Sequence, residues 1–158
     1  MPTDSILLVE SNHRDEVVVL HLLRKNNFQG KVTVARSGEE ALEYLFGQRS
    51  MQRDRATRHP QLIVLELELD KKVDGIEVLR RIHADPRTCH IPVVIFTASQ
   101  NQEHLVKSYG LGCSAFVRKP QDTGELIEAA RNIVLFWQEN EVPPSRDGGQ
   151  PAGTAEMS

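Results

Sequence analysis

The sequence predicts an α/β fold: a doubly wound (βα)5 parallel sheet with the strand order 2-1-3-4-5. Two observations indicate it. Short apolar runs alternate five times with segments of helical periodicity, as in repeated βα units. The runs at 6–9, 62–65 and 93–96 are apolar throughout, which suits parallel strands that helices cover on both faces. Right-handed crossovers then wind the helices onto both faces of the sheet.

The apolar runs are the predicted strands, and two of them also predict positions in the sheet. The second run, VTVA, alternates between apolar and polar residues and is therefore expected at an edge. The first and third strands are expected side by side where the strand order reverses, and such sheets bind ligands there, beyond the carboxyl ends. The strands are predicted at 6–9, 32–35, 62–65, 93–96 and 115–117.

The segments between these runs are predicted helices. Ser37 and Glu40 form an S-x-x-E capping box, which marks the start of the second helix. The last helix has the clearest pattern, because its apolar residues from Leu126 to Trp137 recur at spacings of three and four. The helical patterns cover 15–26, 41–45, 76–82, 102–109 and 126–137.

Composition and charge exclude several classes of function. The formal net charge of -3 provides no basic surface of the kind that nucleic-acid binding requires. Cys89 and Cys113 lie outside any CxxC motif, so neither a zinc site nor a disulfide framework is expected. No apolar run approaches the length of a membrane span. We expect a cytoplasmic protein that binds neither nucleic acid nor membranes.

The chain of 158 residues is expected to form one domain over 1–141, followed by a flexible tail over 142–158. The tail is rich in proline, glycine and polar residues, which cannot bury enough apolar surface to fold. An arginine-rich segment at 47–60 is expected to be a mobile basic loop. We expect no output domain after the predicted domain, so the protein is expected to act by binding a partner protein.

Polar residues follow four of the predicted strands. Glu10 and Ser11 follow the first strand, Glu66 the third, Thr97 the fourth and Lys119 the fifth. The carboxyl ends of parallel strands meet at one edge of a sheet, so these side chains are expected to lie together. Carboxylates hold hard divalent cations, while a hydroxyl and an ammonium group bind phosphoryl oxygens. The set is therefore typical of a site that handles phosphoryl groups.

These motifs, in this order and spacing, resemble the receiver domain of two-component response regulators over residues 5–137. The loop before the third strand and the ending NIVLFWQENEVPP also resemble regulators that partner bacterial phytochrome histidine kinases. The motifs are ILLVESN, PQLIVLELELD, the Asp-Gly pair at 74–75, IPVVIFTAS and AFVRKP.

The resemblance implies a role for each residue of the expected site. It places Glu66 at the phosphoacceptor position, and Glu10 and Ser11 at the positions of an acidic pair. Thr97 and Phe116 match the two switch residues, of which Phe116 is expected to be buried. Lys119 matches the phosphate-sensing lysine. The family also implies a cis peptide bond between this lysine and the following proline.

Departures from the family pattern matter for the chemistry. The family has an aspartate that ligates Mg²⁺ at the position of Ser11, and this chain has a neutral hydroxyl. Glu66 carries one more methylene than the usual acceptor aspartate. Loss of an anionic ligand should weaken Mg²⁺ binding, which leaves Glu10, Glu66 and Glu68 as weak candidate ligands. The longer side chain also displaces the attacking oxygen, and such a shift of about 1 Å can slow a reaction on the order of a hundredfold.

We therefore hypothesise a pseudo-receiver, meaning a receiver domain whose phosphotransfer chemistry is lost or much weakened. In it the Glu66 carboxylate pairs with Lys119, accepts a hydrogen bond from Thr97 and mimics the negative charge of phosphorylation. The alternative remains open that a histidine kinase phosphorylates the strand 3 carboxylate with Mg²⁺. Deliberate replacement of an acceptor aspartate is a third explanation, against which the change at Ser11 argues.

Enzyme classes with related architecture fit less well. A dinucleotide-binding domain would have glycines in the turn after the first strand, and this chain has ESNHRDE there. A phosphatase of the haloacid dehalogenase type would use two aspartates where this chain has Glu66 and Glu68. We therefore expect a binding module and no enzyme.

The expected partners are a phytochrome-type sensor histidine kinase, or another signalling protein, and a second copy of the chain. Ile127, Val134 and Phe136 lie outside the main apolar stripe of the last helix, and such extra apolar surface is typical of an interface. The resemblance implies a homodimer through this C-terminal helix. Coverage of the sheet edge by the same residues is the alternative.

Overall fold

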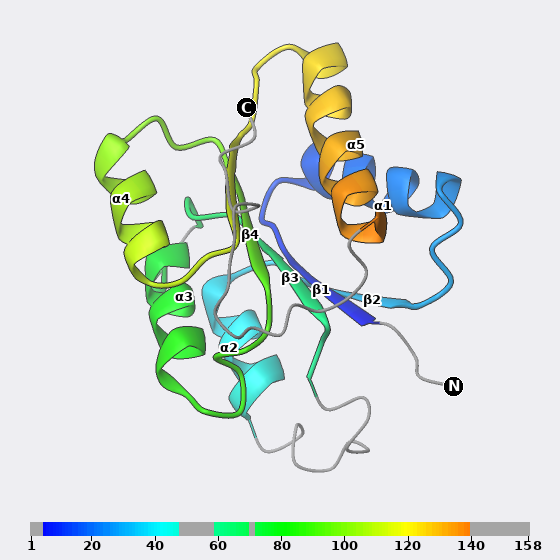
Figure 1. The fold of residues 1–158 in the computed structure, drawn as a ribbon. Coiled ribbons are helices and arrows are strands. Elements are labelled where there is room, and N and C mark those ends of the chain that lie inside the picture. Colours follow the sequence, from blue (N-terminus) through cyan, green and yellow to red (C-terminus); the bar gives the residue numbers. More distant parts are fainter. Residues whose placement is uncertain (1–4, 48–58, 70–71, 140–158) are drawn as a thin grey trace.

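The structure, a computed structural model, describes residues 5–47, 59–69 and 72–139 (Figure 1). Most of the arginine-rich segment and the whole predicted tail at 142–158 lie outside the described residues. The five strands form one parallel sheet in the order β2-β1-β3-β4-β5, which confirms the predicted fold class. β2 lies at an edge, as its alternating pattern predicted.

The elements have the following bounds. The strands are β1 (Ser5–Val9), β2 (Lys31–Ala35), β3 (Leu62–Leu65), β4 (Val93–Thr97) and β5 (Ala115–Arg118). The helices are α1 (His13–Lys25), α2 (Gly38–Phe46), α3 (Gly75–Ala84), α4 (Gln102–Gly110) and α5 (Thr123–Glu139). In the described part of the chain no helix has the length and apolar character needed to span a membrane.

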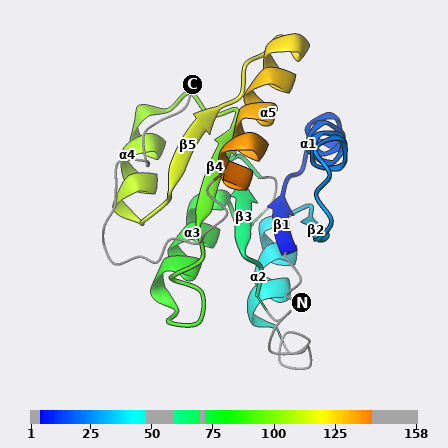
Figure 2. The same cartoon turned by 45° about the vertical axis from the view of Figure 1, so that its right-hand side comes forward.

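Two hydrophobic clusters sandwich the sheet. Successive side chains of a strand point to opposite faces, so Leu7 and Val9 of β1 belong to one cluster and Ile6 and Leu8 to the other. Figure 2 shows α1 and α5 on one face, with α2, α3 and α4 on the opposite face. Each central strand is therefore covered by helices on both faces of the sheet, which explains its continuous apolar sequence.

The strand register brings the carboxyl ends to one edge. Val9 is paired with Leu65, and Leu65 with Ile95. Backbone pairing continues one residue further, because the Glu66 N–H donates to the Val9 carbonyl at 3.0 Å. The residues that follow β1 and β3 are thus neighbours.

Polar side chains begin the helices that lead away from this edge. Asn12 caps α1 by accepting from the Asp15 N–H at 3.0 Å. Ser37 caps α2 and accepts from the Glu40 N–H at 3.0 Å, as the S-x-x-E pattern predicted. Helix α1 begins two residues before its predicted start, because the apolar pattern does not reveal the capping turn.

Gly75 begins α3 where the chain returns to the end of β3. A Cβ atom at this position would lie 2.4 Å from both the Glu66 carbonyl oxygen and the Leu67 Cα. The Gly75 N–H also donates to the Leu67 carbonyl at 2.9 Å. Only glycine allows this close approach, which fixes the backbone that carries Glu66.

Candidate functional site

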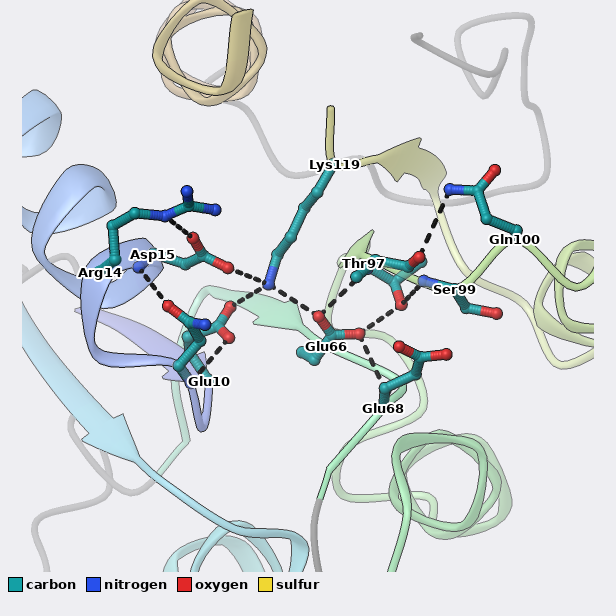
Figure 3. Close-up of polar contacts among 11 residues, drawn as sticks. Glu10, Arg14, Asp15, Glu66, Glu68, Thr97, Ser99, Gln100 and Lys119 are labelled. Atoms are coloured by element: carbon teal, nitrogen blue, oxygen red, sulfur yellow. Dashed lines mark hydrogen bonds and ion pairs between the residues drawn. The ribbon is translucent and has the colours of Figure 1, made fainter. Parts of the chain in front are cut away.

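The Lys119 ammonium group lies at the centre of a cluster of three carboxylates beyond the sheet edge (Figure 3). Its Nζ atom lies 2.8 Å from Glu10 Oε1, 2.8 Å from Asp15 Oδ2 and 2.7 Å from Glu66 Oε1. All four side chains have exposed fractions of only 2–4%. A lysine ammonium has three N–H donors, so each donor has one carboxylate partner.

Glu66 is held at both carboxylate oxygens. Oε1, besides its contact with Lys119, accepts from the Ala98 N–H at 3.2 Å. Oε2 accepts from the Glu68 N–H at 2.8 Å and from the Thr97 hydroxyl. The structure thus contains both contacts that the sequence led us to expect for Glu66, with Lys119 and with Thr97.

Burial and charge shift the protonation of two groups in the cluster. Burial, reinforced by the nearby Glu66 charge and opposed by Lys119, raises the pKa of Glu10 to about 7. Burial alone would lower the pKa of Lys119, but the charges of Glu10 and Glu66 outweigh it and raise that pKa. The lysine therefore stays charged, and Glu10 takes up a proton near neutral pH.

Asp15 is the member of the cluster that the sequence analysis missed. It lies in the first turn of α1 and is buried. Its Oδ1 atom accepts from Arg14 Nε at 3.1 Å, while Oδ2 contacts Lys119. A signal was present in the sequence, because Asp15 precedes Val19 and Leu22 by four and seven residues and so shares the buried stripe of the helix.

The remaining predicted site residues lie outside the carboxylate cluster. Ser11 is exposed beside Glu10 and is not among the contacts of Lys119. Glu68 is exposed and contributes its backbone N–H to Glu66. Phe116 is fully buried in the core, as expected, with the Arg118 guanidinium 5.3 Å from its ring centroid.

The residues as arranged do not fit a divalent cation. Every carboxylate oxygen of Glu10, Asp15 and Glu66 already accepts from a protein N–H or O–H donor. Among the described residues, no group of three His, Cys, Asp or Glu side chains is placed to hold a metal. The predicted ligand set with Glu68 is therefore not assembled, because that side chain points to solvent.

Neutral hydrogen bonds extend from Thr97 to helix α4. The Thr97 hydroxyl oxygen accepts from the Ser99 N–H at 3.1 Å. The Ser99 hydroxyl lies 2.6 Å from His104 Nδ1 and accepts from the Asn101 N–H at 3.2 Å. Which of the two groups donates depends on the tautomer of the His104 imidazole. The sequence analysis had assigned no role to this histidine.

Two further expectations need correction. Val134 was expected outside the buried stripe of the last helix, but it is 4% exposed and belongs to the core between α1, α5 and the sheet. Ile127 also packs against this core, whereas Leu135 is 37% exposed. The cis peptide implied before Pro120 is wrong, because the described residues contain only trans peptide bonds.

The family pattern of the response regulator receiver domain matches residues 6–131. The chain belongs to this family. It is 33% identical over 144 residues to response regulator Rcp1 of Synechocystis sp., an alignment that covers 91% of this chain and 95% of the relative. It is 32% identical over 136 residues to the probable methanogenesis regulatory protein FilR2 of Methanothrix harundinacea, covering 84% of this chain and 82% of the relative.

Solved structures of the family are similar in fold. The Mn²⁺-bound form of Rcp1 has a TM-score of 0.79 at 31% identity, covering 90% of this chain and 99% of that one. The phosphorylated cyanobacterial phytochrome response regulator RcpA has a TM-score of 0.78 at 32% identity with the same coverage. The receiver domain thus has its expected architecture and is a module of two-component signalling.

Proposed function

We propose that this receiver domain is a pseudo-receiver in a phytochrome-type two-component system and acts by binding other proteins. The observation that carries the proposal is that both carboxylate oxygens of Glu66 accept hydrogen bonds from protein donors. Its two oxygens accept from two backbone N–H groups and from Lys119 and Thr97, which match the phosphate-sensing lysine and the switch hydroxyl of this family. A glutamate bound in this way presents a fixed negative charge where regulation would otherwise add one.

The chemistry of the pocket supports a role without phosphotransfer. In-line attack needs a free carboxylate oxygen within about 3 to 3.5 Å of the phosphorus atom. Both oxygens of Glu66 are engaged, and Lys119 lies among the carboxylates that would otherwise coordinate a cation. The neutral hydroxyl of Ser11 adds no anionic ligand. These features favour a pocket that does not accept a phosphoryl group.

The similarity to Rcp1 and RcpA supports a proposal for its partners. We propose a phytochrome-type histidine kinase, or another signalling protein of the same system, in the cytoplasm. A homodimer through α5 is part of this proposal, with Leu135 as its exposed apolar contact. The net charge of -3 does not favour nucleic acid as a partner.

Intact mass spectrometry tests the proposed loss of phosphotransfer. The protein is incubated with Mg²⁺ and either acetyl phosphate or a phytochrome-type histidine kinase. We expect no phosphoryl adduct on the wild-type chain, because no carboxylate oxygen of Glu66 is free to attack. The matched control is the double variant Ser11→Asp with Glu66→Asp, which restores the family pattern and should form the adduct. An adduct on most wild-type molecules would establish the alternative, a phosphorylatable receiver.

Sedimentation velocity at micromolar concentration tests the dimer. We expect a dimer for the wild-type chain and a monomer for Leu135→Glu, because a buried, unpaired charge would destabilise an apolar interface. Val106→Glu is the matched control, since Val106 is exposed on α4. A wild-type chain that sediments only as a monomer would contradict the homodimer.

A further inference from the structure

The unexplained feature of the pocket is Asp15, a buried carboxylate that comes from a helix and not from a strand end. A buried charge is costly unless it is paired and hydrogen-bonded. Asp15 meets this condition through two contacts, 2.8 Å to Lys119 Nζ and 3.1 Å to Arg14 Nε. Lys119 is buried with it, whereas the Arg14 side chain is 50% exposed. The contact with Lys119 is therefore the one that solvent screens least.

Lys119 in turn depends on Asp15 for its third hydrogen bond. Glu10 and Glu66 take two of its three N–H donors, and Ser11, the other residue at the acidic pair, is exposed and uncharged. Without Asp15 one N–H donor of a buried ammonium group would lack a protein acceptor in this arrangement. An unsatisfied buried donor of a charged group is among the costlier defects in a protein interior.

The local structure explains how Asp15 brings a carboxylate to Lys119, although Ser11 provides none. The Asn12 N–H donates to Glu10 Oε2 at 3.1 Å, and the Asn12 side chain caps α1. The first helical turn then carries Asp15 back over the sheet edge toward Lys119, as Figure 3 shows. The start of a helix also favours a carboxylate, because its free N–H groups and dipole are positive.

We propose that Asp15 is a positioning residue that replaces, from helix α1, the carboxylate that the family has at position 11. It directs this charge to the Lys119 ammonium, and so holds the lysine against Glu66 without a divalent cation. The inference rests on the proposed function only in taking Lys119 as the partner of Glu66. The third carboxylate of the pocket thus comes from a residue outside the strand-end motif.

Hydrogen exchange of the Lys119 ammonium protons, followed by ¹H–¹⁵N NMR on the full chain, tests the proposal. In the wild-type chain we expect a slowly exchanging lysine ammonium signal, which Lys119→Met removes and thereby assigns. Asp15→Ala should accelerate its exchange by about tenfold or more, because one N–H donor loses its acceptor. Asp15→Asn should have a smaller effect, since the amide oxygen still accepts. The Asn variant also serves if the Ala variant does not fold.

Two further variants separate a positioning role from simple packing. Arg14→Ala removes the other partner of Asp15 and should leave the exchange rate within about twofold, because Arg14 does not contact Lys119 and its side chain is half exposed. Ser11→Asp combined with Asp15→Ala should restore slow exchange, since position 11 regains the carboxylate. Unchanged exchange in folded Asp15→Ala would overturn the proposal. Failure of the Ser11→Asp rescue would overturn the replacement of position 11 by position 15.

The experiment is independent of phosphotransfer. The exchange measurement contains no phosphodonor and no kinase. If the wild-type chain accepts phosphate in the separate assay, the pseudo-receiver proposal is wrong, but the measured exchange rates are unaffected. Conversely, a chain that resists phosphorylation while Asp15→Ala leaves the ammonium signal unchanged would overturn only the role of Asp15.

Discussion

Glu66 lies between two halves of the pocket that are held together by different kinds of interaction. On one side lie Glu10, Asp15 and Lys119, a buried cluster in which each contact joins opposite charges. On the other side Thr97 leads through neutral hydrogen bonds toward α4. The charged half is enclosed, whereas the neutral half ends at a helix with exposed residues. The comparison shows that ion pairs hold the enclosed half together, whereas hydrogen bonds connect the other half to α4.

The largest expected effect comes from removing the cation of the charged half. Lys119→Met leaves the three carboxylates facing one another without the ammonium group. We expect the free energy of unfolding at pH 8 to fall by about 3 to 5 kcal/mol, as for other broken buried ion pairs. Urea denaturation measures this loss. Lys107→Met, at an exposed lysine of α4, should change stability by less than about 0.5 kcal/mol. Equal losses in both variants would contradict the central role of Lys119.

The pH dependence of stability tests the role of Glu10 in the same charged half. The pKa of Glu10 is raised from 4.5 to about 7 in the folded protein, so the native state binds more protons than the unfolded state between these values. This group therefore makes stability fall as pH rises from about 4.5 to 7, by at most about 3 kcal/mol. Glu10→Gln should remove this slope and be the more stable protein at pH 8. Urea denaturation at pH 5 and pH 8 checks it, and parallel pH profiles of the two proteins would refute it.

The neutral half is expected to be less sensitive. Thr97→Val keeps the side-chain shape but removes the donor to Glu66 and the acceptor of the Ser99 N–H. We expect a loss of about 1 to 3 kcal/mol in the free energy of unfolding, because both groups remain buried. Thr97→Ser is the control, since it retains the hydroxyl, and it should recover most of the hydrogen-bond contribution. A Val variant as stable as the wild type would show that this half contributes nothing.

The smallest expected effect lies at the far end of the neutral half. His104→Ala removes the partner of the Ser99 hydroxyl and should cost about 0.5 to 1.5 kcal/mol. Its effect should be local, with faster amide exchange in the first turn of α4 and unchanged exchange in α1. Glu103→Ala, at an exposed neighbour, serves as the control. Faster exchange in α1 would show that the two halves of the pocket are not separable in this way.

The strands could be predicted because their signal is local. A continuous apolar run such as 62–65 indicates a strand that is covered on both faces. The bounds of each strand in the structure lie within one residue of the predicted bounds. Helix starts were less certain, since α1 begins at a capping turn that carries no apolar pattern. Val134 was misplaced because the position of α1 over α5, and not the helix pattern itself, decides which face is covered.

The candidate site was predictable as far as the chain order of strand ends allowed. Glu10, Glu66, Thr97 and Lys119 follow strands and meet at one edge, because parallel strands end on the same side. Asp15 follows no strand, and its partner Lys119 lies 104 positions away. No pattern local to either residue indicates that pair.

The sequence by itself determined the strands, the helices and the polar strand ends, because hydrophobic periodicity and chain direction are properties of neighbouring residues. Only the tertiary structure decided which donor meets which carboxylate, that Glu68 faces solvent, and that Asp15 joins Lys119. These outcomes depend on the angle at which α1 leaves β1 and on the packing of helices against the sheet. Such angles arise from contacts between distant segments, so they become visible only when the whole chain is folded.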